Sequence, residues 1–383
     1  MRNAALAGVV VLLVCLAAAC GGDSAAERAA EAAGKPGDPG LLKLREDALA
    51  AARVWTAPEI PISEANLRDN PPGPGAFASD AEIACRFKIQ EVNGLTPKFY
   101  CELADGDVVK IKYGAGNAEL PAEVAATRLL GALGFAADRM YVVKRVNCAG
   151  CPTYPYYALR CLQDVGVRSA CLPGGVDYDR VVSFDAAVVE RRLEGRKIEA
   201  TPKHVGWPWF ELEKIDPARG GSPLAEVDAL RLMAVLLSHW DNKAENQRLL
   251  CPAGHDLGDG GCARPVAMLQ DVGATFGPAK AELHNWRTTP IWADPKACTV
   301  SMKNLPWNGA TFPDRQISEG GRLFLLNLLE QLNDQQIRDL FVGSRITAFD
   351  QLSAEGRHPD AWLRVFNDKV KQIRDGGPCP NGQ

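Results

Sequence analysis

The sequence lacks a long run of basic residues, and its overall charge is slightly negative. Its 43 lysines and arginines are outnumbered by 47 aspartates and glutamates, which gives a net charge of −4. A nucleic-acid-binding surface needs a concentration of positive charge. We therefore expect no nucleic acid as a partner. The sequence also shows no internal repeat of fixed period, and its hydrophobic content of 46% is ordinary for a globular protein.

Long apolar runs are also scarce. The run 4–19 is shorter than the roughly 20 apolar residues that a membrane-spanning helix needs. It follows a basic start at Arg2 and ends in small residues before Cys20. This pattern predicts a signal peptide over residues 1–19, and 16–20 resembles a bacterial lipoprotein signal, whose cysteine is lipidated. We expect an exported protein, periplasmic or at the cell surface, held to the membrane by a lipid at Cys20. A simple secretory signal is the alternative.

Zinc-binding patterns of cysteine and histidine are incomplete. Cys148 and Cys151 form a C-x-x-C motif, but neither a second C-x-x-C motif nor a histidine pair accompanies it. In an exported chain the ten cysteines after Cys20 favour disulfides over a redox or zinc motif. Asn93-Gly94 is a strong hairpin signal, with Cys85 and Cys101 placed almost symmetrically about it. The predicted pairs are Cys85–Cys101, Cys148–Cys151, Cys161–Cys171, Cys251–Cys262 and, by elimination, Cys298–Cys379.

Proline- and glycine-rich segments suggest how the chain is divided. Residues 20–78 have the composition of a tether or linker, with a possible short helix over 41–55. We expect a small lobe over 79–193, which contains a cysteine-rich insert at 147–179. A larger lobe follows over 194–377, and 378–383 form a tail.

The apolar periodicity changes between the two expected lobes. In the first, alternation and turn residues predict strands and one helix; in the second, helical spacing dominates. The predicted strands are 87–92, 98–103, 108–113, 140–146 and 184–189. The predicted helices are 122–133, 222–238 with Ser222 as its cap, 320–332 and 359–374. The fold class is therefore α+β, with a small antiparallel β-sheet lobe carrying one helix and a larger, mainly helical lobe.

The most informative polar stretch is 239–246, which reads H-x-D-x-K-x-x-N and is followed by Asp271-Val272-Gly273. Asn246 lies five positions after Asp241, the separation found in the catalytic loop of protein kinases. The resemblance implies that Asp241 orients and deprotonates an acceptor hydroxyl. Asn246 and Asp271 would bind Mg²⁺ or Mn²⁺, hard cations that prefer oxygen ligands. Lys243 would stabilise the transferred charge.

The stretch Val109-Lys110-Ile111-Lys112 resembles the kinase strand whose lysine neutralises the phosphates of the nucleotide. Lys112 fits that position best, and Lys110 remains a candidate because alternate strand residues point to the same face. The helix that follows carries Glu119 and Glu123. We expect Glu123 to pair with the lysine and hold it extended.

The turn Gly94-Leu95-Thr96-Pro97-Lys98 occupies the place of a kinase glycine-rich loop but lacks G-x-G-x-x-G. Its backbone N–H groups could still cradle phosphate, assisted by Lys98. The turn, the lysine strand, the glutamate helix ending in Leu133-Gly134-Phe135 and the D-x-x-x-x-N loop together resemble HipA-like atypical Ser/Thr kinases. The resemblance implies a two-lobed protein-kinase-like fold that binds ATP. The cysteine-rich insert and the export signal depart from that family.

Two functions are consistent with these motifs. The first is an exported phosphotransferase that moves the γ-phosphoryl of ATP, or of another nucleotide, to a hydroxyl on a protein, a sugar or a small molecule. The alternative is a catalytically inactive kinase-like binding module at the cell envelope. A third and weaker reading takes the aromatic residues of 207–210 as a carbohydrate surface, although packing in the core is favoured for them.

Overall fold

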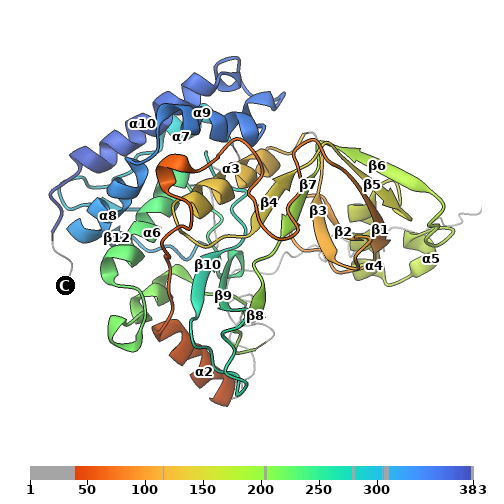
Figure 1. The fold of residues 1–383 in the computed structure, drawn as a ribbon, viewed down its shortest axis with the longest axis horizontal. Helices are drawn as coiled ribbons and strands as arrows, with labels where there is room; N and C mark the ends of the chain where they lie inside the picture. The colour runs from red at the N-terminus through yellow and green to blue at the C-terminus, as the bar shows by residue number, and fades with distance from the viewer. Residues whose placement is uncertain are drawn as a thin grey trace, which may run out of the picture.

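The computed structural model describes residues 39–380, apart from 115, 202–204, 278–280, 304 and 306–309. The predicted signal peptide 1–19, the lipidation at Cys20, the tether up to residue 38 and the tail residues 381–383 lie outside this part. A β-sheet lobe and a helical lobe lie side by side, with helix α3 between them (Figure 1). The predicted two-lobed α+β architecture is confirmed. Within the described part, no helix is both long and apolar enough to cross a membrane.

The small lobe is built on a seven-stranded sheet with the order β4-β7-β3-β2-β1-β5-β6. Its strands are β1 (Glu82–Lys88), β2 (Lys98–Glu102), β3 (Val108–Lys112), β4 (Arg139–Val142), β5 (Arg145–Ala149), β6 (Val181–Asp185) and β7 (Val188–Arg191). Neighbouring strands are antiparallel except β1 and β5, which pair in parallel. The sheet is therefore mixed, whereas the sequence predicted a purely antiparallel one.

One long, bent hairpin supplies both ends of this strand order. Two residues separate β4 from β5, and two separate β6 from β7. Its near half pairs β4 with β7 beside β3, and its far half pairs β5 with β6 beside β1. The sheet is consequently curled around an apolar core that includes Phe87, Phe99 and Val146. The single strand predicted over 184–189 is interrupted because Ala186 adopts a positive φ of 52°.

The connection between β1 and β2 is longer than predicted. β1 ends at Lys88 and β2 begins at Lys98, so the Asn-Gly pair does not form a two-residue hairpin. Val92 is only 1% exposed. Burying that side chain draws the connection back onto the core, which a tight turn cannot do. Gly94 has a φ of 75°, a conformation that glycine adopts at little cost.

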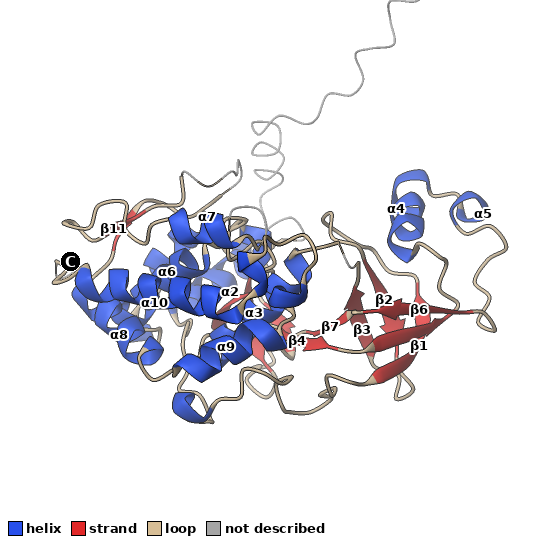
Figure 2. Cartoon of the chain, turned by 90° about the horizontal axis from the view of Figure 1, so that it is seen from above, coloured by secondary structure: helices blue, strands red, loops and turns tan. Residues whose placement is uncertain are grey.

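Helix α3 (Glu119–Ala132) joins the two lobes. Its Leu120 and Val124 pack against Met140 and Val142 of β4. Its other contacts include α9 (Asp334–Gly343) of the large lobe. The insert contributes two further helices, α4 (Pro155–Val165) and α5 (Arg168–Cys171), to a lobe expected to hold one helix. They lie at the end of the sheet that is far from the helical lobe (Figure 2).

The large lobe is organised around the apolar helix α6 (Leu224–Leu237), which packs against α8. Its other helices are α7 (Leu283–Thr288), α8 (Glu319–Leu329), α9 (Asp334–Gly343) and α10 (Pro359–Asp375). Its strands are β8 (Gly195–Lys197), β9 (Gln247–Pro252), β10 (Val266–Leu269), β11 (Thr299–Val300) and β12 (Arg315–Gln316). Ser222 does not cap α6 as predicted, because its hydroxyl accepts from the Val54 N–H and donates to Glu226.

Residues 39–78, which we expected to form part of a linker, lie against the body of the protein. Helix α2 (Pro39–Ala50) is followed by a segment in which Val54 and Leu67 are buried. Arg45 on α2 forms an ion pair of 2.5 Å with Glu211. The apolar side chains of this segment explain its position, because burying them in the large-lobe core is favourable.

All five predicted disulfides are present. They are Cys85–Cys101, Cys148–Cys151, Cys161–Cys171, Cys251–Cys262 and Cys298–Cys379. The first three lie in the small lobe and the last two in the large lobe. Disulfides persist mainly in proteins that leave the reducing cytoplasm, so this pattern is consistent with an extracellular location.

Candidate functional site

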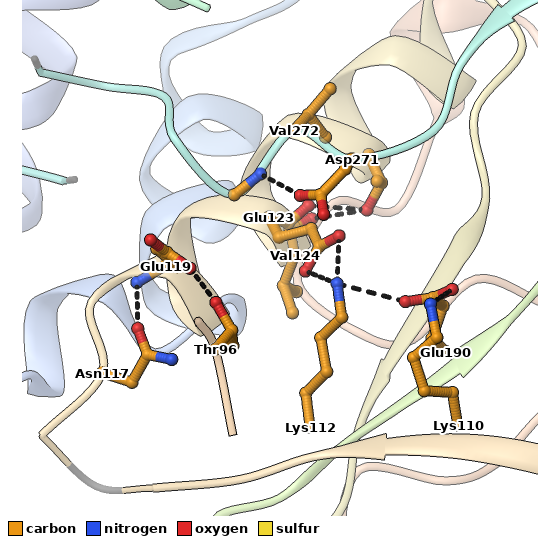
Figure 3. A network of polar contacts seen from close by, with 12 residues as sticks. Thr96, Lys110, Lys112, Asn117, Glu119, Glu123, Val124, Glu190, Asp271 and Val272 are labelled. Carbon is orange, nitrogen blue, oxygen red and sulfur yellow. Dashed lines mark hydrogen bonds and ion pairs between the residues drawn. The ribbon is translucent and has the colours of Figure 1, made fainter. Parts of the chain in front are cut away.

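The small-lobe half of the site is centred on Lys112, near the end of β3. Its Nζ lies 2.6 Å from both carboxylate oxygens of Glu123 on α3. The same Nζ lies 3.1 Å from Oε2 of Glu190 on β7. The side chains of Lys112 and Glu123 are only 3% and 2% exposed. Lys112, rather than Lys110, therefore makes the ion pair with the helix glutamate (Figure 3).

Glu190 is a member of this cluster that the sequence did not reveal. It stands opposite Lys110 in the β3–β7 register, and the Lys110 ammonium donates to it. One carboxylate thus bridges both strand lysines (Figure 3). Two lysines on one strand face require a negatively charged partner when they are buried. The sequence does not identify this partner, because β3 and β7 are far apart in the chain. Only their pairing identifies Glu190 as that partner.

Lys98 stands opposite Lys112 in the β2–β3 register and is 7% exposed. No described residue forms an ion pair with it. Burial and then repulsion by Lys112 lower its pKa to about 8, although Asp271 acts in the opposite direction. A Cβ built on Gly94 would lie 3.5 Å from the Lys98 Nζ, so the turn and the lysine face each other. The Tyr156 hydroxyl holds this turn by donating to the Gly94 carbonyl at 2.7 Å.

Burial and ion pairing shift the pKa values of this cluster in opposite directions. Burial favours the neutral form of each group, and ion pairing favours the charged form. Burial raises the pKa of Glu123 to about 8, and Lys112 only partly offsets this effect. Burial also disfavours charge on Lys112, but attraction by Glu123 and Glu190 outweighs it and raises the lysine pKa. For Glu190, Lys110 and Lys112 outweigh burial and hold the pKa well below its usual range. The cluster therefore keeps cationic lysines in a site that excludes most water.

The large-lobe half of the site begins where α6 ends. Asp241 follows this helix and accepts hydrogen bonds from the Lys243 ammonium at 3.0 Å to each carboxylate oxygen. Their side chains are 25% and 40% exposed. The loop backbone is fixed by the buried Asn242, whose Oδ1 accepts from the N–H groups of Thr311 and Phe312. Asn242 thus fixes the backbone of the loop, while the carboxylate of Asp241 remains accessible to solvent.

His239 is fully buried beneath this loop. Burial lowers its pKa to about 4, so the imidazole is neutral at physiological pH. Among the described residues, neither ring nitrogen has a hydrogen-bond partner. This position agrees with a supporting part of the loop and not with an acid or base.

Asn246 and Asp271 are brought together by the backbone. The carbonyl of Asn246 accepts hydrogen bonds from the N–H groups of Gln270 and Asp271, at 2.9 and 3.1 Å. The amide of Asn246 donates to the carbonyl of Asp241 at 2.6 Å. The longer than usual sequence between Asn246 and Asp271 forms β9, β10 and the excursion closed by Cys251–Cys262. The three motif residues of the large lobe therefore belong to one structural unit.

Asp271 also faces the small lobe, beside Glu123 (Figure 3). Burial disfavours its ionised form, but Lys112 and Lys98 outweigh that effect and lower its pKa. Asp271 is thus a carboxylate that is partly exposed at the junction of the lobes. The acidic residue of the large lobe and the lysines of the small lobe share one electrostatic site.

The donor set suits a divalent cation that arrives with a phosphate ligand. Asn246 and Asp271 offer amide and carboxylate oxygens, the hard ligands of Mg²⁺ and Mn²⁺. Mg²⁺ commonly takes one or two protein carboxylates and completes its shell with water and substrate phosphates. Among the described residues, no carboxylate or histidine group of three or more is close enough to form a complete metal cage. The residues therefore fit a metal shared with phosphate.

A cavity of about 520 Å³ continues from the lysine cluster towards the segment that joins the lobes. Lys110 and Glu190 line one end of it, and Tyr100 and Arg192 line the same region. The cavity wall is consequently charged where it meets the cluster. Glu190, which lines the cavity and contacts Lys112, connects this space to the lysine cluster.

The aromatic segment 207–210 lies mainly in the core. Trp207 and Trp209 are fully buried, and only Phe210 is exposed. Trp209 packs against Phe312 with ring centroids 5.0 Å apart. The buried indole rings cannot form the carbohydrate surface considered above.

We compared the chain with known protein families, curated proteins and solved structures. No family model matches the chain, and no curated protein matches it. Among solved structures it is similar to the crystal structure of a Helicobacter pylori proinflammatory kinase CtkA, with a TM-score of 0.40 and 9% sequence identity. The match covers 76% of this chain and 92% of that one. A likeness of this size says nothing about activity.

Proposed function

We propose that this protein is a kinase-like phosphotransferase that passes the γ-phosphoryl group of a nucleotide to a hydroxyl acceptor. One observation carries the proposal. Lys112 is paired with Glu123, Asp271 lies beside this glutamate (Figure 3), and Asp271 is tied by its backbone to Asn246 in the loop that bears Asp241. Phosphoryl transfer needs this combination of cationic anchor, metal ligand and base.

Each residue has a distinct part in this proposal. Lys112 and Lys98 hold the phosphates, and Glu123 keeps Lys112 extended. Asn246 and Asp271 would hold Mg²⁺ or Mn²⁺, which supplies positive charge against the phosphate oxygens. Asp241 orients the acceptor hydroxyl and takes its proton on a carboxylate oxygen as the new phosphorus–oxygen bond forms.

The pairing of Asp241 with Lys243 supports a role for both residues in transfer. Lys243 reaches the carboxylate from only two positions away and is 40% exposed. An incoming phosphoryl group offers this lysine a second anionic partner. Lys243 then stabilises the transferred charge and leaves Asp241 free to accept a proton.

The closer family and the location belong to the same proposal. The turn at Gly94, the lysine strand and the loop of Asp241 favour the HipA-like branch of atypical kinases. The five disulfides favour an exported protein, and the pattern around Cys20 favours a lipid anchor. The acceptor is then a hydroxyl on a protein, a sugar or a small molecule at the cell envelope, without a nucleic-acid partner.

The first test is the thermal midpoint of the oxidised protein with ATP and Mg²⁺ or Mn²⁺. A ligand that binds only the folded state raises this midpoint. We expect a metal-dependent rise in the wild type that is lost in Asp271→Ala. Asp259→Ala is the matched control, because it removes the same charge from an exposed turn of the β9–β10 excursion. A rise that persists in Asp271→Ala would contradict the assignment of this residue.

The second candidate is a kinase-like binding module without transfer activity. The observation behind it is the contact of Lys243 with both carboxylate oxygens of Asp241: if this pair persists when nucleotide is bound, the carboxylate stays occupied and takes no proton. A protein that binds nucleotide but transfers no phosphoryl group to any hydroxyl would support this module. A protein that binds no nucleotide would likewise not be the proposed phosphotransferase.

A further inference from the structure

Two of the small-lobe disulfides touch each other. Cys85–Cys101 joins β1 to β2, and Cys148–Cys151 closes the turn that follows β5. Cys85 and Cys148 are partners in the parallel β1–β5 register. The sulfur atoms of Cys101 and Cys148 are 3.6 Å apart. Those of Cys85, Cys101 and Cys148 all lie within 4.8 Å of one another, and Cys151 is bonded to Cys148.

This four-cysteine cluster, Cys85, Cys101, Cys148 and Cys151, is almost completely removed from solvent. Its members are between 0% and 6% exposed. The sequence shows a C-x-x-C motif without the second ligand pair that a zinc site requires. The curled sheet supplies that pair, because β2 and β5 lie on either side of β1. No other group of three or more potential ligands is this close among the described residues.

We propose that the four-cysteine cluster, when reduced, is a tetrahedral binding site for Zn²⁺. Four cysteine thiolates are a common ligand set for structural zinc, and the Zn–S distance of about 2.3 Å places neighbouring sulfurs roughly 3.8 Å apart. The Cys101–Cys148 separation of 3.6 Å is close to that value. The two bonded sulfur pairs separate by a similar amount once their disulfides are reduced.

The chemistry balances with an external dithiol as the reductant. Reduction of both disulfides adds four electrons and four protons to the cluster, while two dithiols are oxidised to disulfides. Zn²⁺ then binds the four sulfurs as thiolates and displaces the four protons. The metal site and the pair of disulfides are thus alternative cross-links between the same strands, and neither depends on the proposed phosphoryl transfer.

Cobalt absorption offers a direct test with the purified protein. The protein is reduced without oxygen by a phosphine, titrated with Co²⁺ and then with Zn²⁺. We expect one equivalent of Co²⁺ to produce thiolate-to-metal absorption, and one equivalent of Zn²⁺ to abolish it. The double variant Cys85→Ser/Cys101→Ser should lose this absorption. The matched control Cys251→Ser/Cys262→Ser also removes one disulfide and should keep it.

Two further measurements check that the variants are folded. Each double variant is examined in its oxidised form, in which four of the five disulfides remain. Zn²⁺ should raise the thermal midpoint of the reduced wild type and of the control variant, and should leave the oxidised wild type unchanged. The proposal is overturned by an absence of metal binding, or by binding that survives Cys85→Ser/Cys101→Ser.

Discussion

The two halves of the candidate site are built in different ways. In the small lobe, Lys112, Glu123 and Glu190 have side chains no more than 3% exposed, and both glutamates contact the lysine directly. In the large lobe, Asp241 and Lys243 are 25% and 40% exposed and pair only locally. The first half is a buried charge cluster, and the second is an accessible loop whose backbone is fixed.

This difference indicates which half is formed before ligand arrives. A buried charge without a partner costs several kcal/mol, so the lysines and glutamates of the small lobe must assemble as the protein folds. The large-lobe loop instead depends on backbone contacts, such as those made by Asn242 and by the carbonyl of Asn246. Its exposed side chains can exchange one partner for another at little cost.

Lys112→Ala is expected to have the largest effect. It leaves Glu123 and Glu190 buried without their shared cation, so the free energy of unfolding should fall by about 3 to 5 kcal/mol. The nucleotide-dependent rise of the thermal midpoint should also disappear. Urea denaturation measures the first effect. The control is Lys88→Ala in the partly exposed pair with Glu102 on a neighbouring strand, where we expect a loss of at most about 1 kcal/mol. Equal losses in both variants would contradict the contrast.

Asp241→Asn should abolish most phosphoryl transfer and leave stability almost unchanged. Loss of a general base typically lowers the rate by about 10² to 10⁴-fold, whereas a partly exposed ion pair contributes little to folding. The initial rate of transfer, or of nucleotide hydrolysis where no acceptor is known, is measured beside the thermal midpoint. Asp259→Asn serves as the control. Full activity in Asp241→Asn would remove this residue from the mechanism.

Lys98 should give the small lobe a pH dependence that the large-lobe loop lacks. Its folded pKa of about 8 is below the ordinary value of 10.5, because burial and then Lys112 disfavour its charge. Between these values the unfolded chain binds more protons, so stability rises with pH. Below pH 8, the buried positive charge of Lys98 lowers the free energy of unfolding by its full amount. By pH 10.5 the folded protein has lost this proton, and the resulting gain in the free energy of unfolding is on the order of 3 kcal/mol.

The comparison of wild type with Lys98→Met isolates this effect from the titration of other groups. Denaturation curves collected from pH 7 to pH 10.5 should show the wild type gaining stability relative to Lys98→Met as the pH rises through 8. Lys110, Glu123 and Asp271 also act on Lys98 and are common to both proteins. A constant difference across this range would mean that Lys98 keeps an ordinary pKa.

Lys243→Ala is expected to have the smallest effect on stability, below about 1 kcal/mol, because its ion pair with Asp241 is open to solvent. The double variant Lys243→Ala/Asp241→Asn shows through a double-mutant cycle whether the pair contributes to folding. A coupling energy of several kcal/mol would place this pair with the buried cluster of the small lobe.

Much of this arrangement could be predicted because it depends on local patterns. The helix that bears Glu123 and the lysine strand follow from residue periodicity. The Cys85–Cys101 pair follows from its placement about Asn93-Gly94, and Cys298–Cys379 was assigned by elimination. The connection between β1 and β2 could not be predicted, because burial of Val92 outweighed the turn preference of Asn93-Gly94. The packing of residues 39–78 was also missed, since their apolar side chains found a core that is distant in sequence.

The sequence by itself determined the order of the motifs and the residue types that the site requires. Asp241, Asn246 and Asp271 could be chosen as candidates from motif spacing, because each belongs to a short segment with its own pattern, whereas the sequence left Lys110 and Lys112 open. Only the tertiary structure decided that Glu190 pairs with both strand lysines and that Cys85 and Cys101 complete the sulfur group of Cys148. These contacts join strands that are far apart in the chain, and their geometry is set by the curvature and register of the sheet.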